Sequence, residues 1–220
     1  IQDARQLAKA PNFGFPGGLG AESFVDFARS SGVDLTPPEY ANAPASVRRQ
    51  AAIDRAKELK AVWLRTWPEM ARYFQDLGRA TESGDYQYRL PRTGFVRGGL
   101  RFTNACNHGF QSIVAHAGKR ALWRVFVESY LGRWEGAGRS PLFGFRPVLF
   151  LHDEIIGEAP EGSADAMGRR LATVMVESLQ HYCPDVPITA EPALMRRWYK
   201  GAKTVYDADG RLIPWEPKEK

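Results

Sequence analysis

Features that would place this chain in a specialised class of proteins are scarce in its sequence. Two cysteines, Cys106 and Cys183, are too few for a disulfide framework, and the four histidines show no zinc-site spacing. No apolar run approaches the roughly 18 residues of a membrane-spanning helix. The first nine residues include Asp3, Arg5 and Lys9 and no apolar segment, so they do not resemble a signal peptide. We expect a cytoplasmic protein that makes no membrane contact.

Acidic residues are missing from one long stretch in the middle of the chain. Residues 86–127 hold seven Arg and Lys and no Asp or Glu, and seven aromatic residues are interleaved with them. Residues 141–220, in contrast, have a net charge of −2. A basic stretch without carboxylates suits a polyanion, because each phosphate that it neutralises releases condensed counterions. The alternative is a solvated basic surface whose aromatic residues belong to the core.

The remaining sequence has the composition and periodicity of a folded protein. With 44% hydrophobic and 12% aromatic residues, a disordered chain is excluded, and 220 residues allow one large domain or two small ones. Apolar periodicity predicts helices over residues 1–13, 21–30, 46–77, 104–132 and 163–183. Alternation and turn residues predict short strands within 81–101, 146–157 and 187–199. The order of these elements predicts an α+β fold.

Two residues are expected to set helix boundaries. Pro68 either starts a new helix or kinks the helix predicted over 46–77. Ser163 is expected to cap the last helix, because a serine hydroxyl can accept a hydrogen bond from an unpaired backbone N–H of the first turn.

The first candidate site is His152-Asp153-Glu154, which lies between two apolar segments. Unpaired carboxylates beside buried strands are costly, so we expect a partner that compensates them. Mg²⁺ is a natural partner, since it binds one or two carboxylates together with substrate phosphates and water. The alternative is a solvent-exposed turn in which Asp and Glu are ordinary turn residues.

The second candidate site is a stripe formed by Arg5, Lys9 and Phe13 on the first helix. Steps of four residues place side chains on one helix face, so two cations and a ring there can bind a triphosphate and stack under a base or sugar. The alternative is an ordinary helix with a basic solvated face and Phe13 in the core. The glycines at 14–20 do not match a phosphate loop, because no apolar strand precedes them and no Lys-Ser/Thr pair follows.

The third candidate site lies on the long helix predicted in the middle of the chain. Asn107 and Gln111, four residues apart, present amides on one face that can reach minor-groove acceptors or sugar oxygens, and Lys119 and Arg120 follow. The alternative is a helix start that Asn104 or Asn107 caps. We assign no functional role to the other histidines of the chain.

The order and spacing of these three segments resemble family A DNA polymerases, the bacterial DNA polymerase I group. Residues 5–14 (Arg-x-x-x-Lys-x-x-Asn-Phe-Gly) resemble motif B of the fingers, and residues 8–20 look most like bacteriophage members. Asn107-x-x-x-Gln111 with Lys119 is similar to the family's DNA-contacting helix, and residues 148–154 are similar to motif C, an apolar strand that ends in His-Asp-Glu.

The resemblance covers nearly the whole chain and implies its domain organisation. Residues 1–85 are expected to form a helical fingers subdomain. Residues 86–220 are expected to form part of a polymerase palm, with an antiparallel sheet and packed helices.

The resemblance also implies catalytic and nucleotide-binding roles. Asp153 is expected to bind a pair of catalytic Mg²⁺ ions, with Glu154 as a less direct contributor to metal binding. Arg5 and Lys9 are expected to bind the incoming deoxynucleoside triphosphate, with Lys9 as the acid that protonates pyrophosphate. Phe13 is expected to pack against the sugar and base of that nucleotide.

Contacts with primer–template DNA are implied in the same way. Asn107 and Gln111 are expected to touch the duplex near the primer terminus, and His152 the primer end. The basic stretch 86–127, which includes Lys119, is expected to lie along the duplex backbone.

The chain departs from the family pattern at several positions. Gly17 stands where the family usually has a Tyr, and Thr103 stands where an Arg is often found, for which Arg101 is expected to substitute. Motif A, the strand with the other metal-binding Asp, has no counterpart in the sequence. We therefore expect the C-terminal segment of a polymerase from a bacterial or phage-infected cell. It is expected to polymerise DNA only with an N-terminal segment that carries motif A, either a separate chain or the rest of a longer one.

Two further hypotheses remain open. The chain could be a non-catalytic nucleic-acid-binding or assembly module that kept the polymerase fold. Asp153 and Glu154 discriminate against it, because a module freed from catalysis need not keep paired carboxylates at the end of a buried strand. The third hypothesis is a relative of the single-subunit RNA polymerases, and the sequence does not decide the sugar because the element that excludes ribose would lie upstream.

Overall fold

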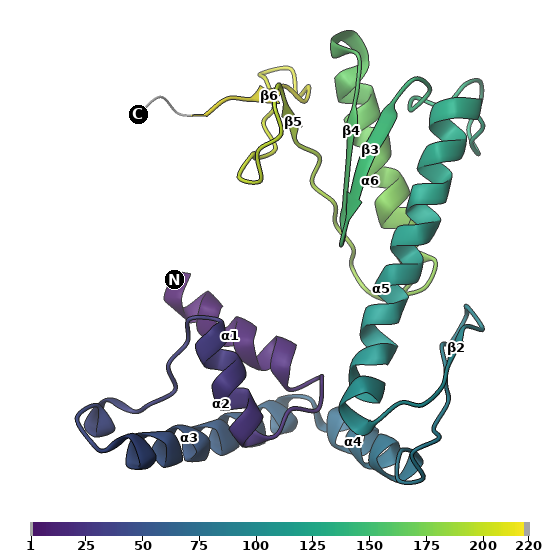
Figure 1. The fold of residues 1–220 in the computed structure, drawn as a ribbon. Helices are drawn as coiled ribbons and strands as arrows, with labels where there is room; N and C mark the ends of the chain where they lie inside the picture. The colour runs from purple at the N-terminus through teal and green to yellow at the C-terminus, as the bar shows by residue number, and fades with distance from the viewer. Residues whose placement is uncertain (1, 218–220) are drawn as a thin grey trace. The chain divides into compact units, whose positions relative to one another are not determined.

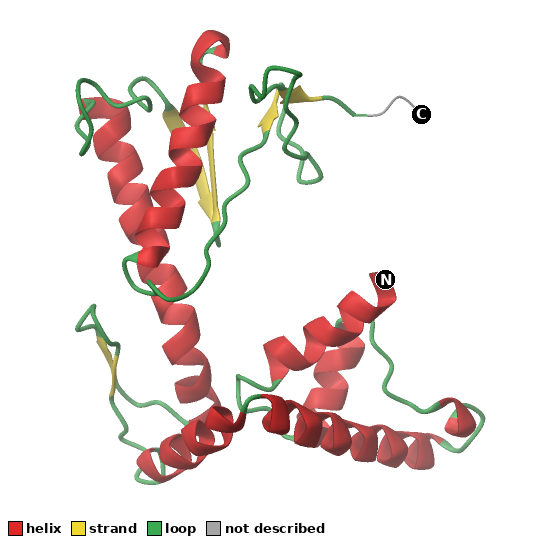
Figure 2. Cartoon of the chain, turned by 180° about the vertical axis from the view of Figure 1, so that it is seen from behind, coloured by secondary structure: helices red, strands yellow, loops and turns green. Residues whose placement is uncertain are grey.

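A computed structural model of the chain describes residues 2–217, with side chains from Ala8 onward. It divides into two compact units, Ile1–Gln111 and Ser112–Lys220, and the division falls inside the helix α5 (Phe102–Phe126). Helices dominate both units, and the strands of the described part form three two-stranded sheets (Figure 1). Figure 2 shows the same mixture of long helices and short strands. The predicted α+β fold is confirmed.

The helices of the first unit lie close to where the periodicity predicts them. Before α5 they are α1 (Gln2–Gly14), α2 (Ala21–Ser30), a 3₁₀ turn η1 (Pro38–Tyr40), α3 (Ala45–Thr66) and α4 (Pro68–Ala80). Pro68 is the first residue of α4, where a missing backbone N–H leaves no helical hydrogen bond unmade. It therefore starts a new helix rather than kinking one long helix.

The main core of the first unit forms between α1, α2 and α3. Phe15, which follows α1, is fully buried, and its ring centroid lies 4.2 Å from that of Phe24 and 5.8 Å from that of Trp63. Burial of side chains of this size stabilises a fold by roughly 1.5–3 kcal/mol each. The other buried members of this core are Ala10, Val25, Ala28, Leu35, Ala52, Ile53 and Ala56.

A second core of the first unit links α4, the start of α5 and a short hairpin. The hairpin pairs β1 (Tyr88–Arg89) with β2 (Val96–Arg97) in antiparallel fashion. The buried residues of this core are Leu77, Leu100, Ala105 and Cys106. Because this core packs the hairpin against α4, the compact unit extends beyond residue 85. The assignment of 1–85 and 86–220 to fingers and palm stays a prediction.

The second unit contains the end of α5, a hairpin and the helix α6 (Ala164–Gln180) (Figure 1). The hairpin pairs β3 (Arg146–Leu151) with β4 (Glu154–Glu158), as the apolar segments on either side of His152-Asp153 predict. A π-helical turn, Val127–Leu131, follows α5 directly. The core of this unit consists of Ala121, Val125, Leu142, Phe145, Ile155, Met167 and Val174.

The strand β3 is not buried in this unit, although its apolar run predicts a buried strand. Val148 is 66% exposed, and Leu149 and Leu151 are also exposed, whereas Phe150 packs partly against the core. A two-stranded hairpin covered by helices on one side leaves its other face open. The expectation of a buried strand is therefore wrong for the described chain.

The apolar spacing of α5 predicts one buried face that includes Phe110, Ala117, Ala121, Val125 and Phe126, and this prediction is correct only in part. Ala117, Ala121 and Val125 are buried, as their spacing predicts, but Phe110 and Phe126 are each more than 40% exposed. Apolar residues occur on several faces of this helix, so periodicity does not single out the packed face.

The C-terminal segment is largely irregular. The strand predicted over 187–199 shortens to β5 (Leu194–Met195), which pairs in parallel with β6 (Pro214–Trp215). Ser163 closes a 3₁₀ turn, η3 (Glu161–Ser163), and precedes α6 without capping it, since its backbone is not extended as a capping residue requires. Within the described range, no helix combines the length and apolarity needed to cross a membrane.

Candidate functional site

Lys9 and Phe13 lie side by side on an exposed face of α1. The Lys9 Nζ atom is 5.6 Å from the centroid of the Phe13 ring, and Phe13 is 66% exposed. The prediction that a four-residue step places them on one face is confirmed, and the alternative with Phe13 in the core is wrong. The backbone of Arg5 belongs to the same helix, but its side chain lies outside the described residues.

Neighbouring residues of the motif anchor the end of α1. The Trp63 Nε1–H group donates a hydrogen bond of 3.1 Å to Asn12 Oδ1. Gly14 is buried so closely that an added Cβ would lie 2.9 Å from the Phe24 ring. Phe15 is fully buried. Because Asn12, Gly14 and Phe15 are all held by the core, the exposed position of Phe13 is fixed by its neighbours.

The glycine-rich loop after α1 packs against α5. A Cβ at Gly17 would lie 2.8 Å from both Nδ2 and Oδ1 of Asn107. Gly18 has φ of 77°, and a Cβ there would lie 2.9 Å from Phe102 and 3.0 Å from the Cys106 Sγ atom. Glycine therefore allows this loop and this helix to approach more closely than any other residue would. The contact joins the loop after α1 to the helix that carries the predicted DNA contacts.

Lys60 of α3 fastens the same loop, and the sequence analysis did not identify it. Its Nζ atom donates a hydrogen bond of 2.8 Å to the Leu19 carbonyl oxygen. It also lies 6.0 Å from the ring centroid of Phe15 and 5.7 Å from that of Phe74. Partial burial lowers the pKa of Lys60. In the sequence, Lys60 lies within an apolar helix pattern, which is the one sign that its side chain could be partly buried. A lysine in such a pattern is normally interpreted as a solvated residue.

Asn107 lies well inside α5 rather than at its start. Its Nδ2 group donates a hydrogen bond of 3.1 Å to the Thr103 carbonyl oxygen of the preceding turn. Because α5 begins at Phe102, the alternative in which Asn104 or Asn107 caps this helix is wrong.

Three other predicted DNA contacts have exposed side chains. Gln111 is exposed on α5, one turn beyond Asn107, and Lys119 is exposed two turns further along the same helix. Arg101 is exposed immediately before α5. Each of these side chains is accessible to a ligand, and their contacts with DNA stay predictions.

His152 and Asp153 form the two-residue turn between β3 and β4. Leu151 and Glu154 pair directly across this turn. His152 has φ of 54°, in the left-handed region that non-glycine residues rarely adopt. His152, Asp153 and Glu154 are all exposed, and neither carboxylate forms a hydrogen bond or ion pair with the side chains that the structure describes. The turn matches the solvent-exposed alternative and also leaves both carboxylates open to a ligand.

The carboxylates at this turn fit a magnesium ion that shares its coordination with other groups. Mg²⁺ takes one or two protein carboxylates and fills its remaining positions with water and phosphate oxygens. Among residues 8–217, no group of three His, Cys, Asp or Glu side chains is placed to hold a metal ion. Asp153 and Glu154 can therefore supply part of a metal site, and the pair of Mg²⁺ ions stays a prediction.

The helix α5 approaches β3 close to this turn. A Cβ at Gly118 would lie 2.6 Å from the Cζ atom of Phe150. Lys119 follows Gly118 in the chain, and Phe150 stands two residues before His152. The second unit therefore brings the basic part of α5 against the hairpin that carries the carboxylates.

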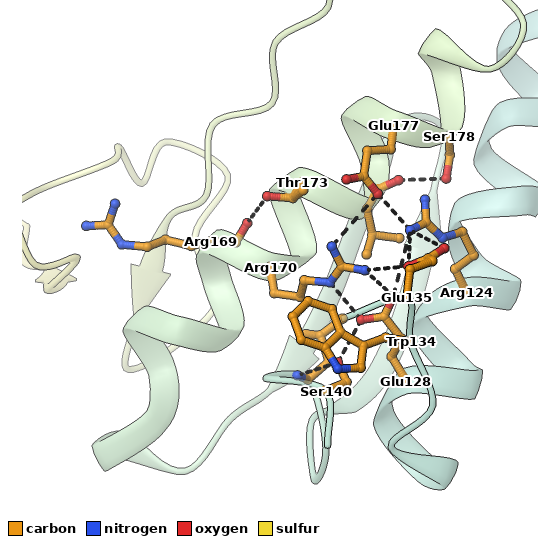
Figure 3. Close-up of polar contacts among 12 residues, drawn as sticks. Arg124, Glu128, Trp134, Glu135, Ser140, Arg169, Arg170, Thr173, Glu177 and Ser178 are labelled. Carbon is orange, nitrogen blue, oxygen red and sulfur yellow. Dashed lines mark hydrogen bonds and ion pairs between the residues drawn. The ribbon is translucent and has the colours of Figure 1, made fainter. Parts of the chain in front are cut away.

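A buried ion-pair network joins α5, the loop after it and α6 (Figure 3). Arg170 donates hydrogen bonds of 2.8 and 2.7 Å to the two carboxylate oxygens of Glu128, and both side chains are less than 10% exposed. Ser140 donates a further hydrogen bond of 2.7 Å to Glu128, and the Arg170 guanidinium lies 4.8 Å from the Trp134 ring. The hydrogen bonds to Glu128 raise the pKa of Arg170.

Arg124 also belongs to this network, which corrects one interpretation of the basic stretch. It donates hydrogen bonds to Glu177 at 2.7 Å and to Glu135 at 3.2 Å, and its side chain is 14% exposed. These carboxylates lie outside residues 86–127, so the absence of acids within the stretch did not reveal them. Arg124 is therefore engaged inside the protein, while the exposed cations of the stretch are Arg89, Arg92, Arg97, Arg101, Lys119 and Arg120.

Some aromatic residues of the basic stretch pack in the core and others are exposed. Tyr86, Tyr88 and Phe102 pack against the second core of the first unit, whereas Phe95 and Trp123 are exposed. His108, to which we assigned no role, is buried against the rings of Tyr88 and Phe95. The stretch is thus both a basic surface and a contributor to the core.

The predicted site residues fall into one group in each unit. The first unit holds Lys9, Phe13, Arg101, Asn107 and Gln111, and the second holds Lys119, His152, Asp153 and Glu154. No protein-family model matches the chain, and no curated protein matches it either. The resemblance to family A DNA polymerases therefore rests on the motifs and their order.

Proposed function

We propose that this chain carries the nucleotide-binding and part of the metal-binding machinery of a template-directed DNA polymerase of the family A type. The observation that supports this most is the β3–β4 turn, which holds Asp153 and Glu154 together and exposed at the end of an apolar hairpin. A turn with no protein partner for two adjacent carboxylates suits a cation that also binds phosphate. The reaction is nucleotidyl transfer from a deoxynucleoside triphosphate to a primer 3′-hydroxyl.

The exposed face of α1 is the proposed binding site for the incoming nucleotide. The Lys9 ammonium group neutralises the triphosphate and gives a proton to the pyrophosphate oxygen that leaves. The Phe13 ring, 5.6 Å from Lys9 Nζ, packs against the base and sugar. We propose Arg5, one turn before Lys9 on α1, as a second ligand for phosphate.

Primer–template DNA is proposed to contact the exposed side of α5 and the hairpin turn. Gln111 and Asn107 contribute amides toward the minor groove, and Lys119 contributes charge toward the phosphates. His152, adjacent to Asp153 in the turn, is proposed to contact the primer terminus.

The proposed metal site needs a further carboxylate. When bound, Mg²⁺ ions lower the pKa of the attacking hydroxyl and stabilise the leaving pyrophosphate. We propose that another segment, in a separate chain or in a longer form of this chain, brings a second Asp on a strand. The exposed apolar face of β3, with Val148 at 66% and Leu149 at 48% exposure, provides a surface that such a strand can cover.

A primer-extension assay of the chain tests this proposal. The chain is mixed with a candidate segment that carries motif A, and extension of a labelled primer is measured with Mg²⁺. We expect extension only in the mixture, with a loss of about 100-fold or more in Asp153→Ala. Glu158→Gln, at the other end of β4 and also exposed, is the control and should keep full activity.

Three results would contradict the proposal. Robust extension by this chain alone would show that no second Asp is needed. Full activity of Asp153→Ala in the complemented mixture would remove the hairpin turn from the metal site. Binding of primer–template without any extension in all mixtures would favour the non-catalytic binding module.

A further inference from the structure

A second stretch without acidic residues lies near the C-terminus. Residues 192–206 contain Arg196, Arg197, Lys200 and Lys203 and no Asp or Glu. The net charge of −2 over residues 141–220 hides this stretch, because acidic residues precede and follow it. Its basic residues surround a pair of adjacent aromatic residues, Trp198 and Tyr199.

The aromatic rings of this segment are presented to solvent. Trp198 is 55% exposed and Tyr199 is 56% exposed. The Tyr199 ring stacks on Trp215, with centroids 5.2 Å apart and planes 11° apart, and still keeps more than half of its side chain exposed. Large aromatic side chains at this exposure are unfavourable in water, so a ligand that covers them gains free energy.

The backbone around the rings is held in a defined shape. Tyr199 lies on a turn closed by a hydrogen bond of 3.0 Å from the Ala202 N–H to the Tyr199 carbonyl oxygen. A Cβ at Gly201 would lie 2.5 Å from the Tyr199 ring, so glycine is required for the ring to lie this close to the chain. The pairing of β5 with β6 brings Trp215 to the ring. The stack is therefore built by contacts within the described segment.

The cations of the segment differ in what they contact. Arg196 forms ion pairs with Glu161 at 3.3 Å and Glu216 at 3.5 Å. Arg197 and Lys200, which flank the two rings, are exposed and form no ion pair with any side chain that the structure describes. Two uncompensated cations beside two exposed rings are suited to a ligand with alternating anionic groups and planar rings.

We propose that residues 196–203 form a binding surface for single-stranded nucleic acid. Bases stack on Trp198 and on the exposed part of the Tyr199 ring, while Arg197 and Lys200 contact the phosphates between them. Base–aromatic stacking requires unpaired bases, so this surface discriminates against duplex, unlike a purely basic patch. The proposal does not depend on the polymerase assignment, because none of the polymerase motifs lies in this segment.

Fluorescence anisotropy with the full chain tests the surface. The probes are labelled oligonucleotides of about 16 thymidylates or uridylates and a blunt DNA duplex of similar length. We expect Trp198→Ala to weaken single-strand binding by about fivefold to 100-fold and to leave duplex binding unchanged. Comparison of the thymidylate and uridylate probes shows whether the surface prefers DNA or RNA.

Matched variants separate this surface from general electrostatics. Trp67→Ala removes a Trp of similar exposure, 53%, from the first unit and should leave binding unchanged. Arg197→Glu/Lys200→Glu should weaken single-strand binding more than Arg48→Glu/Arg65→Glu, which makes the same change of net charge at exposed positions outside both basic stretches. Gly201→Ala should act like Trp198→Ala, because it displaces the Tyr199 ring.

The proposal is overturned if Trp198→Ala binds the single strands as tightly as Trp67→Ala does. It is also overturned if the two double charge reversals weaken binding equally, since that result shows only non-specific attraction. Because Trp198, Arg197 and Lys200 are exposed, their variants are expected to fold. A primer-extension assay that fails while single-strand binding depends on Trp198 would reject the polymerase proposal and keep this one.

Discussion

Arg170 of α6 forms two hydrogen bonds, of 2.8 and 2.7 Å, with both carboxylate oxygens of Glu128, which lies in the π-helical turn after α5. Both side chains are buried, at 9% and 3% exposure. The pair connects two helices of the second unit beside the hairpin that carries Asp153. Removing one partner of a buried ion pair destabilises the fold, because the remaining charge has neither water nor a partner.

Arg170→Met is therefore expected to destabilise the second unit strongly. The variant leaves the Glu128 carboxylate buried without its main partner, which typically costs about 3–5 kcal/mol. Urea unfolding followed by circular dichroism measures the change in the free energy of unfolding. Arg72→Met is the control, since Arg72 is 87% exposed and its ion pair with Asp76 is worth at most about 1 kcal/mol. Equal effects of the two variants would contradict the importance of the buried pair.

The two phenylalanines at positions 13 and 15 are expected to respond in opposite ways to truncation. Phe13→Ala should leave the free energy of unfolding within about 0.5 kcal/mol, because the ring is 66% exposed. Phe15→Ala should lose about 3–5 kcal/mol, because the ring is fully buried against Phe24 and Trp63. If Phe13 binds nucleotide, its truncation raises the KM for deoxynucleoside triphosphate in the complemented extension assay. An unchanged KM would remove Phe13 from the nucleotide site.

His152 is expected to lower the free energy of unfolding, because its backbone conformation in the turn is unfavourable. Its φ of 54° is unfavourable for a residue with a Cβ, and glycine adopts it readily. His152→Gly should raise the free energy of unfolding by about 1 kcal/mol, whereas His152→Ala should not, because alanine keeps the Cβ. Primer extension should fall in both variants if the imidazole contacts the primer. A more stable His152→Ala variant would show that the backbone conformation is not the cause.

Asp165 is expected to make the C-terminal segment sensitive to acid. Its Oδ1 atom accepts hydrogen bonds from the Leu212 N–H at 2.7 Å and from Arg169 at 2.8 Å, and these contacts lower the pKa of Asp165. A carboxylate with a lowered pKa contributes stability that is present above its ordinary pKa and is lost as the pH falls through the lower value. The Leu212 amide chemical shift should therefore titrate with a midpoint below the ordinary pKa of an aspartate.

The control for this titration is Asp26→Ala, which removes a carboxylate of lowered pKa from the first unit. It should leave the Leu212 midpoint unchanged, whereas Asp165→Ala should abolish the titration. A Leu212 midpoint at or above the ordinary pKa of an aspartate would show that the hydrogen bond does not favour the charged carboxylate.

The elements of this fold were predictable where one local property decides them. Pro68 marks the start of α4 because a proline lacks the N–H that a first-turn residue does not need. The two apolar segments around His152-Asp153 predict a hairpin, because a short polar turn between two apolar segments favours pairing of adjacent strands. Residues that are close in sequence thus determine helix starts, turns and pairing of adjacent strands.

Contacts between distant residues were not predictable from the same patterns. Arg124 reads as a DNA-facing cation because its partner Glu177 is 53 residues away in the chain. The apolar run of β3 specifies a strand but not what covers it, and Val148 is exposed in the second unit. At position 13 the sequence predicts the contact but not the burial. The spacing of Lys9 and Phe13 predicts that the two side chains lie together, but it does not decide whether the ring is buried.

The close contact between Gly17 and Asn107 has a consequence for how such chains can change over generations. The Asn107 amide lies 2.8 Å from where even a Cβ at position 17 would stand. A larger residue at position 17 therefore requires the Asn107 side chain to move or to be replaced by a smaller one. Substitutions that enlarge position 17 are expected to be tolerated only in chains in which position 107 has already become smaller.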